Sequence, residues 1–304
     1  MTGLLFETCI PLAILIAVGF MAGKYQPTDM KSVPIIAIYG ITPLVGLGAA
    51  AQMHFTPQLA LLPFVTFFLA ALVAGVSMAV GRIALTDAGQ RYLLPVACGS
   101  GNTGYFGLPI VLALFGDKAA GVYFLANLGV SIFETTIGYY FIVRGTTTPR
   151  AAFVRVARLP LIYALAAGLV LSGFDVALPA WFLKLWGMTK GAYAVVGMMI
   201  AGLALAQQPG FTLNPRLLGV TVLGRFVFWP CAALGFGWLD AHLLHWFDSQ
   251  TDHLLIVLSL VPVAANLPAY AATVGSYVKD CALLVLISTI AAIIGLPFIL
   301  PLLL

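Results

Sequence analysis

The segment from Gly99 to Pro109, GSGNTGYFGLP, interrupts a long apolar stretch with four glycines and a proline. Relative to Ala, Gly weakens a helix by about 1 kcal/mol per residue and Pro by about 3 kcal/mol. We therefore predict that a helix enters near Leu93, unwinds near Asn102 and begins again after Pro109. Inside a bilayer, irregular backbone survives only where protein buries it or where it lines a wet cavity. The segment is thus a candidate binding site.

The composition excludes a soluble globular protein. Of 304 residues, 62% are hydrophobic and 8% are charged, whereas soluble domains carry about 25% charged residues. No dense basic cluster is present, so nucleic acid is not an expected partner. The cysteines at positions 9, 98, 231 and 281 lack C-x-x-C spacing and are expected to be small buried residues. Neither metal-ligand nor Ser/His/Asp patterns stand out, so we expect no enzyme activity, cofactor or metal.

Long apolar stretches fill the chain. About 20 apolar residues cross the core of a bilayer, and on that measure we predict an all-α polytopic membrane protein with ten spans. In chain order the spans cover 4–23, 32–52, 58–81, 92–115, 119–143, 159–174, 188–207, 215–238, 253–276 and 280–303.

The placement of Lys and Arg predicts the orientation. If the amino terminus is outside, ten basic residues fall in inner loops and three in outer loops, so the positive-inside rule places both termini outside. The inner residues are Lys24, Lys31, Arg82, Arg91, Arg144, Arg150, Arg155, Arg158, Arg216 and Lys279, and the outer residues are Lys118, Lys184 and Lys190.

The two halves of the chain are similar. PLAILIAVG at 11–19 aligns with PLIYALAAG at 160–168, and GLGAAAQMHFT at 46–56 aligns with GLALAQQPGFT at 202–212, which pairs Gln52 with Gln208 and Phe55 with Phe211. We therefore predict a first five-helix repeat at 1–143, a basic cytoplasmic linker at 144–158 and a second repeat at 159–304. Five helices are an odd number, so the second repeat would be inverted, as in secondary transporters.

A second break is predicted in span 9, the repeat partner of span 4. Its sequence LSLVPVAANLPAYAATVGSY contains Pro262, Asn266 and Pro268. Pro within a helix frees a carbonyl and bends the axis. A plain proline kink is the alternative to a functional break.

These motifs resemble the auxin efflux carrier family, which includes plant PIN-type carriers and bacterial permeases for malonate and other organic acids. The resemblance rests on ACGSGNTGYFGLPIVLALFGDKA, on VSIFET in span 5 and, more loosely, on VPVAAN in span 9. It implies a fold like that of bile-acid and sodium/proton carriers, in a plasma membrane of the bacterial inner-membrane type. Spans 1, 2, 6 and 7 would form a scaffold, with dimerisation through it, and spans 3–5 and 8–10 a transport domain in which broken helices 4 and 9 cross.

The resemblance also assigns substrate-side positions, namely Asn102, Pro109, Pro262 and Asn266. Pro268 departs from the family pattern, which puts the local geometry of span 9 in question, and the long central loop of the plant carriers is absent. The complete predicted substrate site comprises Asn102, Thr103, Gly104, Tyr105, Pro109, Pro262, Asn266 and Pro268. The amides of Asn102 and Asn266 can hold a carboxylate without a fixed cation, or can instead satisfy backbone groups that the breaks leave free.

Glu134 and Arg225 are charged residues in the middle of spans 5 and 8. Intramembrane charges are functional hypotheses by default. One interpretation is a structural ion pair between them; the other is that Glu134 binds a coupled proton or sodium ion, or that Arg225 helps to hold a substrate carboxylate.

The sequence thus predicts a secondary transporter for a small organic anion, a mono- or dicarboxylate such as malonate or an auxin-like acid, working by elevator-type alternating access. An anion channel or a membrane sensor is the alternative. A channel should show polar stripes along several helices, and a sensor usually carries a soluble output domain.

Overall fold

Residues 1–26, 32–142, 150, 154, 157–207, 214–273, 275 and 277–304 are described by a computed structural model. Within them the fold is all helical, apart from one isolated β-bridge between Gly101 and Val263. Seven helical stretches in these residues are long and apolar enough to cross a membrane, which makes the chain a multi-pass membrane protein. They contain α1 (Thr2–Tyr25), α2 (Ser32–Ile36) with α3 (Thr42–Ala51), α4 (Leu62–Ala84), α7 (Asp117–Phe133) with α8 (Tyr139–Ile142), α11 (Ala180–Ala206), α12 (Pro215–Leu223) with α13 (Trp229–Leu239), and α16 (Val278–Leu303).

The remaining helices are shorter. They are α5 (Ala88–Gly99), α6 (Leu108–Phe115), α10 (Pro160–Gly173), α14 (Ser249–Leu260) and α15 (Leu267–Thr273). The chain is therefore interrupted between α5 and α6 and between α14 and α15, in the two segments where the sequence predicts breaks.

The first break is shorter than predicted, and the prediction that the helix begins again after Pro109 is wrong. The helix resumes at Thr103 as a π-helical turn, Thr103–Gly107, and continues directly into α6. The carbonyl of Asn102 accepts the N–H groups of Phe106 and Gly107, both at 3.2 Å. Pro109 is the second residue of α6 and follows the π-helical turn without interruption.

The second break spans 261–266, between the end of α14 and the start of α15. Pro262 lies inside it, and Pro268 is the second residue of α15. Pro268 therefore occupies the first turn of a new helix, where the absent N–H group has no partner to lose.

Two helix pairs hold the parts of the predicted scaffold together, α1 with α11 and α3 with α10. Their backbones approach closely at glycines. A Cβ on Gly168 of α10 would lie 2.6 Å from the carbonyl oxygen of Leu47 in α3. Small residues permit such contacts between membrane helices.

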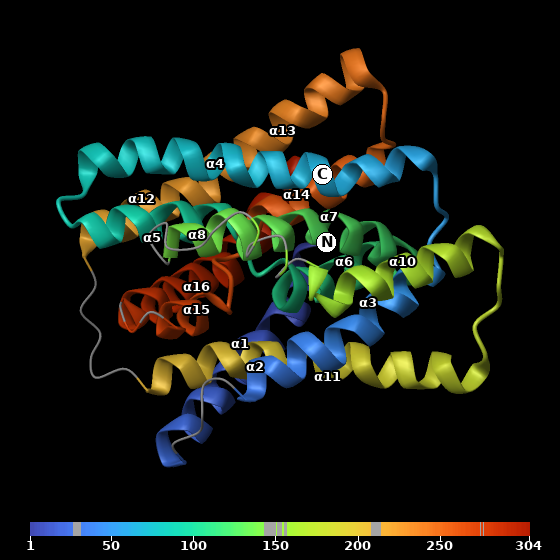
Figure 1. The fold of residues 1–304 in the computed structure, drawn as a ribbon, viewed down its shortest axis with the longest axis horizontal. Coiled ribbons are helices and arrows are strands. Elements are labelled where there is room, and N and C mark those ends of the chain that lie inside the picture. Colours follow the sequence, from blue (N-terminus) through green and yellow to red (C-terminus); the bar gives the residue numbers. More distant parts are fainter. Residues whose placement is uncertain are drawn as a thin grey trace.

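A second group of helices packs around α4, which contacts α5, α7, α12 and α13. The hydroxyl of Thr66 in α4 donates a 2.7 Å hydrogen bond to the carbonyl of Ala126 in α7. Figure 1 shows α4 and α11 on opposite sides of the molecule. Several residues that carry the orientation and repeat predictions, Lys31, Arg144, Arg155, Gln208 and Phe211, lie outside the described residues, as does most of the linker 144–158.

Candidate functional site

The two breaks lie against each other. The backbone N–H of Asn102 donates to the carbonyl of Pro262 at 2.8 Å, beside the antiparallel bridge between Gly101 and Val263. The N–H of Val263 in turn donates to the Ser288 hydroxyl of α16 at 3.1 Å. Buried backbone groups must find partners. The N–H of one break and the carbonyl of the other thus become hydrogen-bond partners, which replaces bonds that the interrupted helices no longer provide.

Arg225 is completely buried behind this junction. Its Nε donates to the carbonyl of Val261 at 2.9 Å and its Nη1 to that of Cys98 at 3.2 Å, while Nη2 reaches the carbonyls of Leu258 and Ser259 at 3.3 and 3.4 Å. These oxygens lie at the carboxyl ends of α5 and α14, where the helix dipoles are negative. A single guanidinium therefore serves the ends of both interrupted helices.

The structure does not bring Glu134 and Arg225 together. Arg225 contacts backbone carbonyls, and the ion pair found among the described residues joins Lys190 to Asp117. Arg225 also does not line the cavity described next. In this conformation it neither pairs with Glu134 nor faces a ligand.

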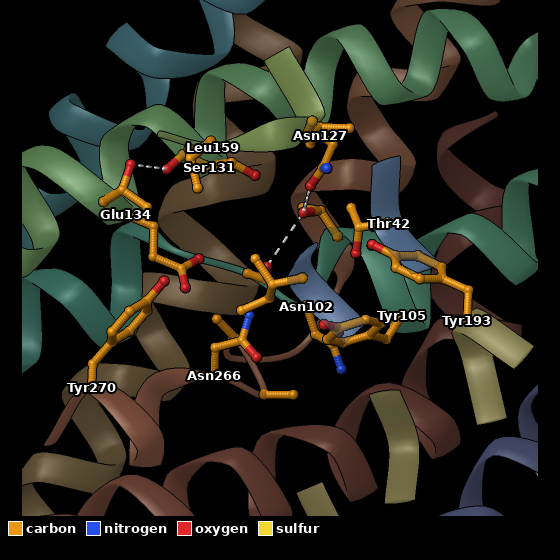
Figure 2. A pocket seen from close by; sticks show the side chains of 18 of the residues that line it. Thr42, Asn102, Tyr105, Asn127, Ser131, Glu134, Leu159, Tyr193, Asn266 and Tyr270 are labelled. Carbon is orange, nitrogen blue, oxygen red and sulfur yellow. Dashed lines mark hydrogen bonds between the residues drawn. The ribbon is translucent and has the colours of Figure 1, made fainter. Parts of the chain in front are cut away.

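A cavity of about 80 Å³ adjoins the two breaks (Figure 2). Residues from both breaks and from the predicted spans 2, 5, 6 and 7 line it. Six of the predicted site residues are among them, namely Asn102, Thr103, Gly104, Tyr105, Glu134 and Asn266, whereas Pro109, Pro262 and Pro268 are not.

Two tyrosines form an aromatic wall of the cavity. The rings of Tyr105 and Tyr193 are 4.7 Å apart between centroids, and both side chains are buried. A Cβ on Gly104 would collide with the Tyr193 hydroxyl, and a Cβ on Gly197 would collide with the Tyr105 ring. The glycine in the first π-helical turn is therefore needed so that α11 can approach the break.

Side-chain amides and hydroxyls occupy the same region. The hydroxyl of Thr103 donates to Oδ1 of Asn127, and Nδ2 of Asn102 lies 3.8 Å from the Met198 sulfur. The Asn102 side chain does not cap the π-helical turn; its backbone carbonyl accepts those N–H groups instead. The side-chain amide of Asn102 is therefore not used to pair the backbone groups of this turn.

Two buried oxygens at the cavity have no hydrogen-bond partner among the described residues. They are Oε1 of Glu134 and Oδ1 of Asn266. Glu134 is 8% exposed, and the Tyr270 hydroxyl points toward its carboxyl group (Figure 2). Among the described residues, the lining includes no Lys, Arg or His. Within that part of the chain, Glu134 has no cationic side chain facing it in the cavity.

Sequence reasoning missed the lining residues Thr42, Asn127, Ser131, Tyr193 and Tyr270. Asn127 carried a usable signal, because an amide in an apolar span is costly unless it is satisfied. The tyrosines and hydroxyl residues carried none, since such residues are common in membrane helices.

Other sequence candidates lie away from this cavity. Nε2 of Gln52 donates to the Gly48 carbonyl of its own helix at 2.9 Å. Cys9, Cys98 and Cys281 are buried and Cys231 is exposed. No group of three or more His, Cys, Asp or Glu residues in the described part of the chain is arranged to hold a metal ion.

No family model matches this chain, and no curated protein matches it significantly.

Proposed function

We propose that this protein is a secondary transporter that carries a small organic anion, a mono- or dicarboxylate, through the cavity at the two breaks. The observation that carries the proposal is that both interrupted helices line one cavity, which also contains the buried polar side chains of Asn127 and Glu134. Interrupted helices that meet at a site between repeats are typical of secondary transporters.

The chemistry of the cavity favours a carboxylate. The helix 103–115 begins at its lining, and the first N–H groups of a helix lack intrahelical partners and carry partial positive charge. The amides of Asn102 and Asn266 add donors. Arg225 already serves the opposite, negative ends of α5 and α14. The positive start of the helix 103–115 is thus available to a ligand in the cavity.

The position of the cavity supports movement of the elevator type. Its lining combines Thr42 and Tyr193, from the predicted scaffold spans 2 and 7, with residues of the two breaks and of span 5. A site at such a boundary changes its exposure when one group of helices slides against the other. The ten-span inverted repeat, the relation to auxin efflux carriers and a scaffold-mediated homodimer are parts of the same proposal.

Glu134 is the position at which a positive charge is expected to accompany the anion. An ionised carboxyl beside a bound carboxylate is unfavourable, because two negative charges would lie close together within a membrane protein. A coupled proton, a sodium ion or a cationic group of the substrate itself would remove the repulsion.

Ligand-induced thermal stabilisation of the purified protein tests the proposal. Small carboxylates, including acetate, propionate and malonate, are titrated against the parent, Asn102→Ala and Asn266→Ala, with Asn214→Ala as the matched control. Asn214 caps α12 and does not line the cavity. A bound ligand raises apparent stability by RT ln(1 + [L]/Kd). We expect stabilisation of the parent and the control, and its loss in both cavity variants. Equal stabilisation in all four proteins would contradict the proposal.

A further inference from the structure

The cavity has an imbalance of hydrogen-bonding groups that a plain carboxylate does not correct. Its two unpartnered buried oxygens, Oε1 of Glu134 and Oδ1 of Asn266, are both acceptors in the structure. A carboxylate offers only further acceptors. Bound beside Glu134, it would bring a second negative charge to a cavity in which the described lining residues include no Lys, Arg or His.

Hydrogen-bond donors and the unpartnered acceptor of Glu134 lie on different sides of the cavity. In Figure 2, Tyr105 and Asn127 lie on one side, Glu134 and Tyr270 lie on the other, and Asn266 lies between them. The helix start at Thr103 belongs to the first side, because the Thr103 hydroxyl donates to Asn127. The first side offers donors to an anion. The second side offers the carboxyl oxygen of Glu134, which attracts a cationic donor.

We propose that the ligand of this cavity is a small zwitterion of the amino-acid type, with its carboxylate at the start of the helix 103–115 and its protonated amine at Glu134 and Asn266. This inference rests on the proposed function and narrows its substrate class. The ammonium donates to the two unpartnered oxygens and supplies the positive charge that Glu134 lacks. The small volume of the cavity, about 80 Å³, favours a ligand with a short side chain.

Protonation of Glu134 is the competing way to neutralise the site, and one substitution separates the two. Glu134→Gln resembles a protonated carboxyl, because it is neutral and can donate a hydrogen bond. If a proton sits on Glu134 when the ligand binds, this variant keeps or gains affinity. If an ammonium group sits there, the variant loses affinity.

A panel of ligands with one carbon skeleton tests the inference on the purified parent protein. Propionate has the carboxylate alone, lactate adds a neutral donor, alanine adds an ammonium and propylamine has the ammonium alone. Isothermal titration gives each affinity. We expect alanine to bind at least about tenfold more tightly than propionate, as a charge-assisted hydrogen bond in a buried site would give. Lactate should fall between them, and propylamine should bind weakly.

The same panel is then applied to Glu134→Gln, with Thr136→Ser as the matched control, because Thr136 donates to the Ile132 carbonyl of its own helix and does not line the cavity. We expect the control to keep the preference for alanine over propionate and Glu134→Gln to abolish it. If Glu134→Gln fails to fold, the parent panel alone decides. Propionate or malonate binding the parent as tightly as alanine overturns the inference, and so does a preference for alanine that survives in a folded Glu134→Gln protein.

Failure of this inference is distinguishable from failure of the proposed function. If propionate and malonate bind in an Asn102-dependent manner but alanine gains nothing, the zwitterion assignment is wrong and the carboxylate carrier stands. If none of these ligands binds the parent, both are wrong.

Discussion

The backbone N–H of Asn102 donates a 2.8 Å hydrogen bond to the carbonyl oxygen of Pro262, so the main chain itself joins the two interrupted helices. Next to this bond, Gly101 passes close to the Arg225 guanidinium and to Val261. The junction and the cavity beside it therefore depend on backbone that approaches a buried cation without a side chain in between.

Gly101→Ala should disrupt this junction. The added Cβ would lie 2.6 Å from Nη2 of Arg225 and 2.9 Å from Cγ2 of Val261. Overpacking of this kind costs about 1 to 3 kcal/mol. Gly75→Ala in α4 is the control, because a Cβ there has no atom within 4 Å among the described residues. Thermal unfolding in detergent should show a clear loss for Gly101→Ala and none for Gly75→Ala; equal midpoints would contradict the described geometry.

Arg225→Met should destabilise the protein more than any single cavity substitution. It removes the donor from the carbonyls of Leu258, Ser259 and Val261 at the end of α14, and each buried acceptor left unpaired costs about 1 to 3 kcal/mol. The Cys98 carbonyl at the end of α5 keeps the Trp229 indole N–H as a donor. Arg225→Lys should restore only part of the stability, because an ammonium cannot reproduce the fork of donors. The unfolding midpoints of the three proteins check the order. A stable Arg225→Met protein would show that Arg225 is not what holds the end of α14.

Gly104→Ala and Tyr193→Phe should compensate each other. The methyl group of Gly104→Ala collides with the Tyr193 hydroxyl, whereas the next ring atom, Cζ, would be 3.1 Å away. Removing the hydroxyl relieves most of the clash, so a double-mutant cycle should be strongly non-additive. Stability and ligand binding are measured for the parent, both single variants and the double variant. Additive losses would mean that α11 does not press on the break as described.

The interrupted helices could be predicted because Gly and Pro act locally on helix stability. The residue at which the helix begins again could not be predicted, because it depends on the Asn102 carbonyl, which accepts two N–H groups from a π-helical turn. For the same reason the sequence places Pro109 in the break, whereas in the structure Pro109 lies inside the helix 103–115.

The charged residues show a similar limit. Glu134 and Arg225 could be predicted as site candidates because each is a charged residue within an apolar span. Their partners depend on which elements pack together. Nothing in the spacing of Arg225 points to carbonyls at 98 and 261, which come from two other helices. Tyr193 joins the site only because α11 crosses the break.

The orientation is open to a direct labelling experiment. The positive-inside rule places Arg82 inside and Lys118 outside, and both side chains are exposed. Arg82→Cys and Lys118→Cys are made in a Cys231→Ser background, since Cys231 is the exposed native cysteine and the other three are buried. In intact cells a membrane-impermeant maleimide should label only the cysteine at 118. The reverse pattern would invert the topology.

Counterflow in proteoliposomes tests the central claim most directly. Vesicles loaded with unlabelled malonate or alanine are diluted into the same labelled compound, with the parent, Asn102→Ala or Asn214→Ala reconstituted at equal density and checked for insertion. A carrier that uses the cavity should give saturable, transient accumulation of label with the parent and Asn214→Ala, and none with Asn102→Ala. Non-saturable flux without counterflow, or accumulation by Asn102→Ala equal to that of the parent, would contradict the account.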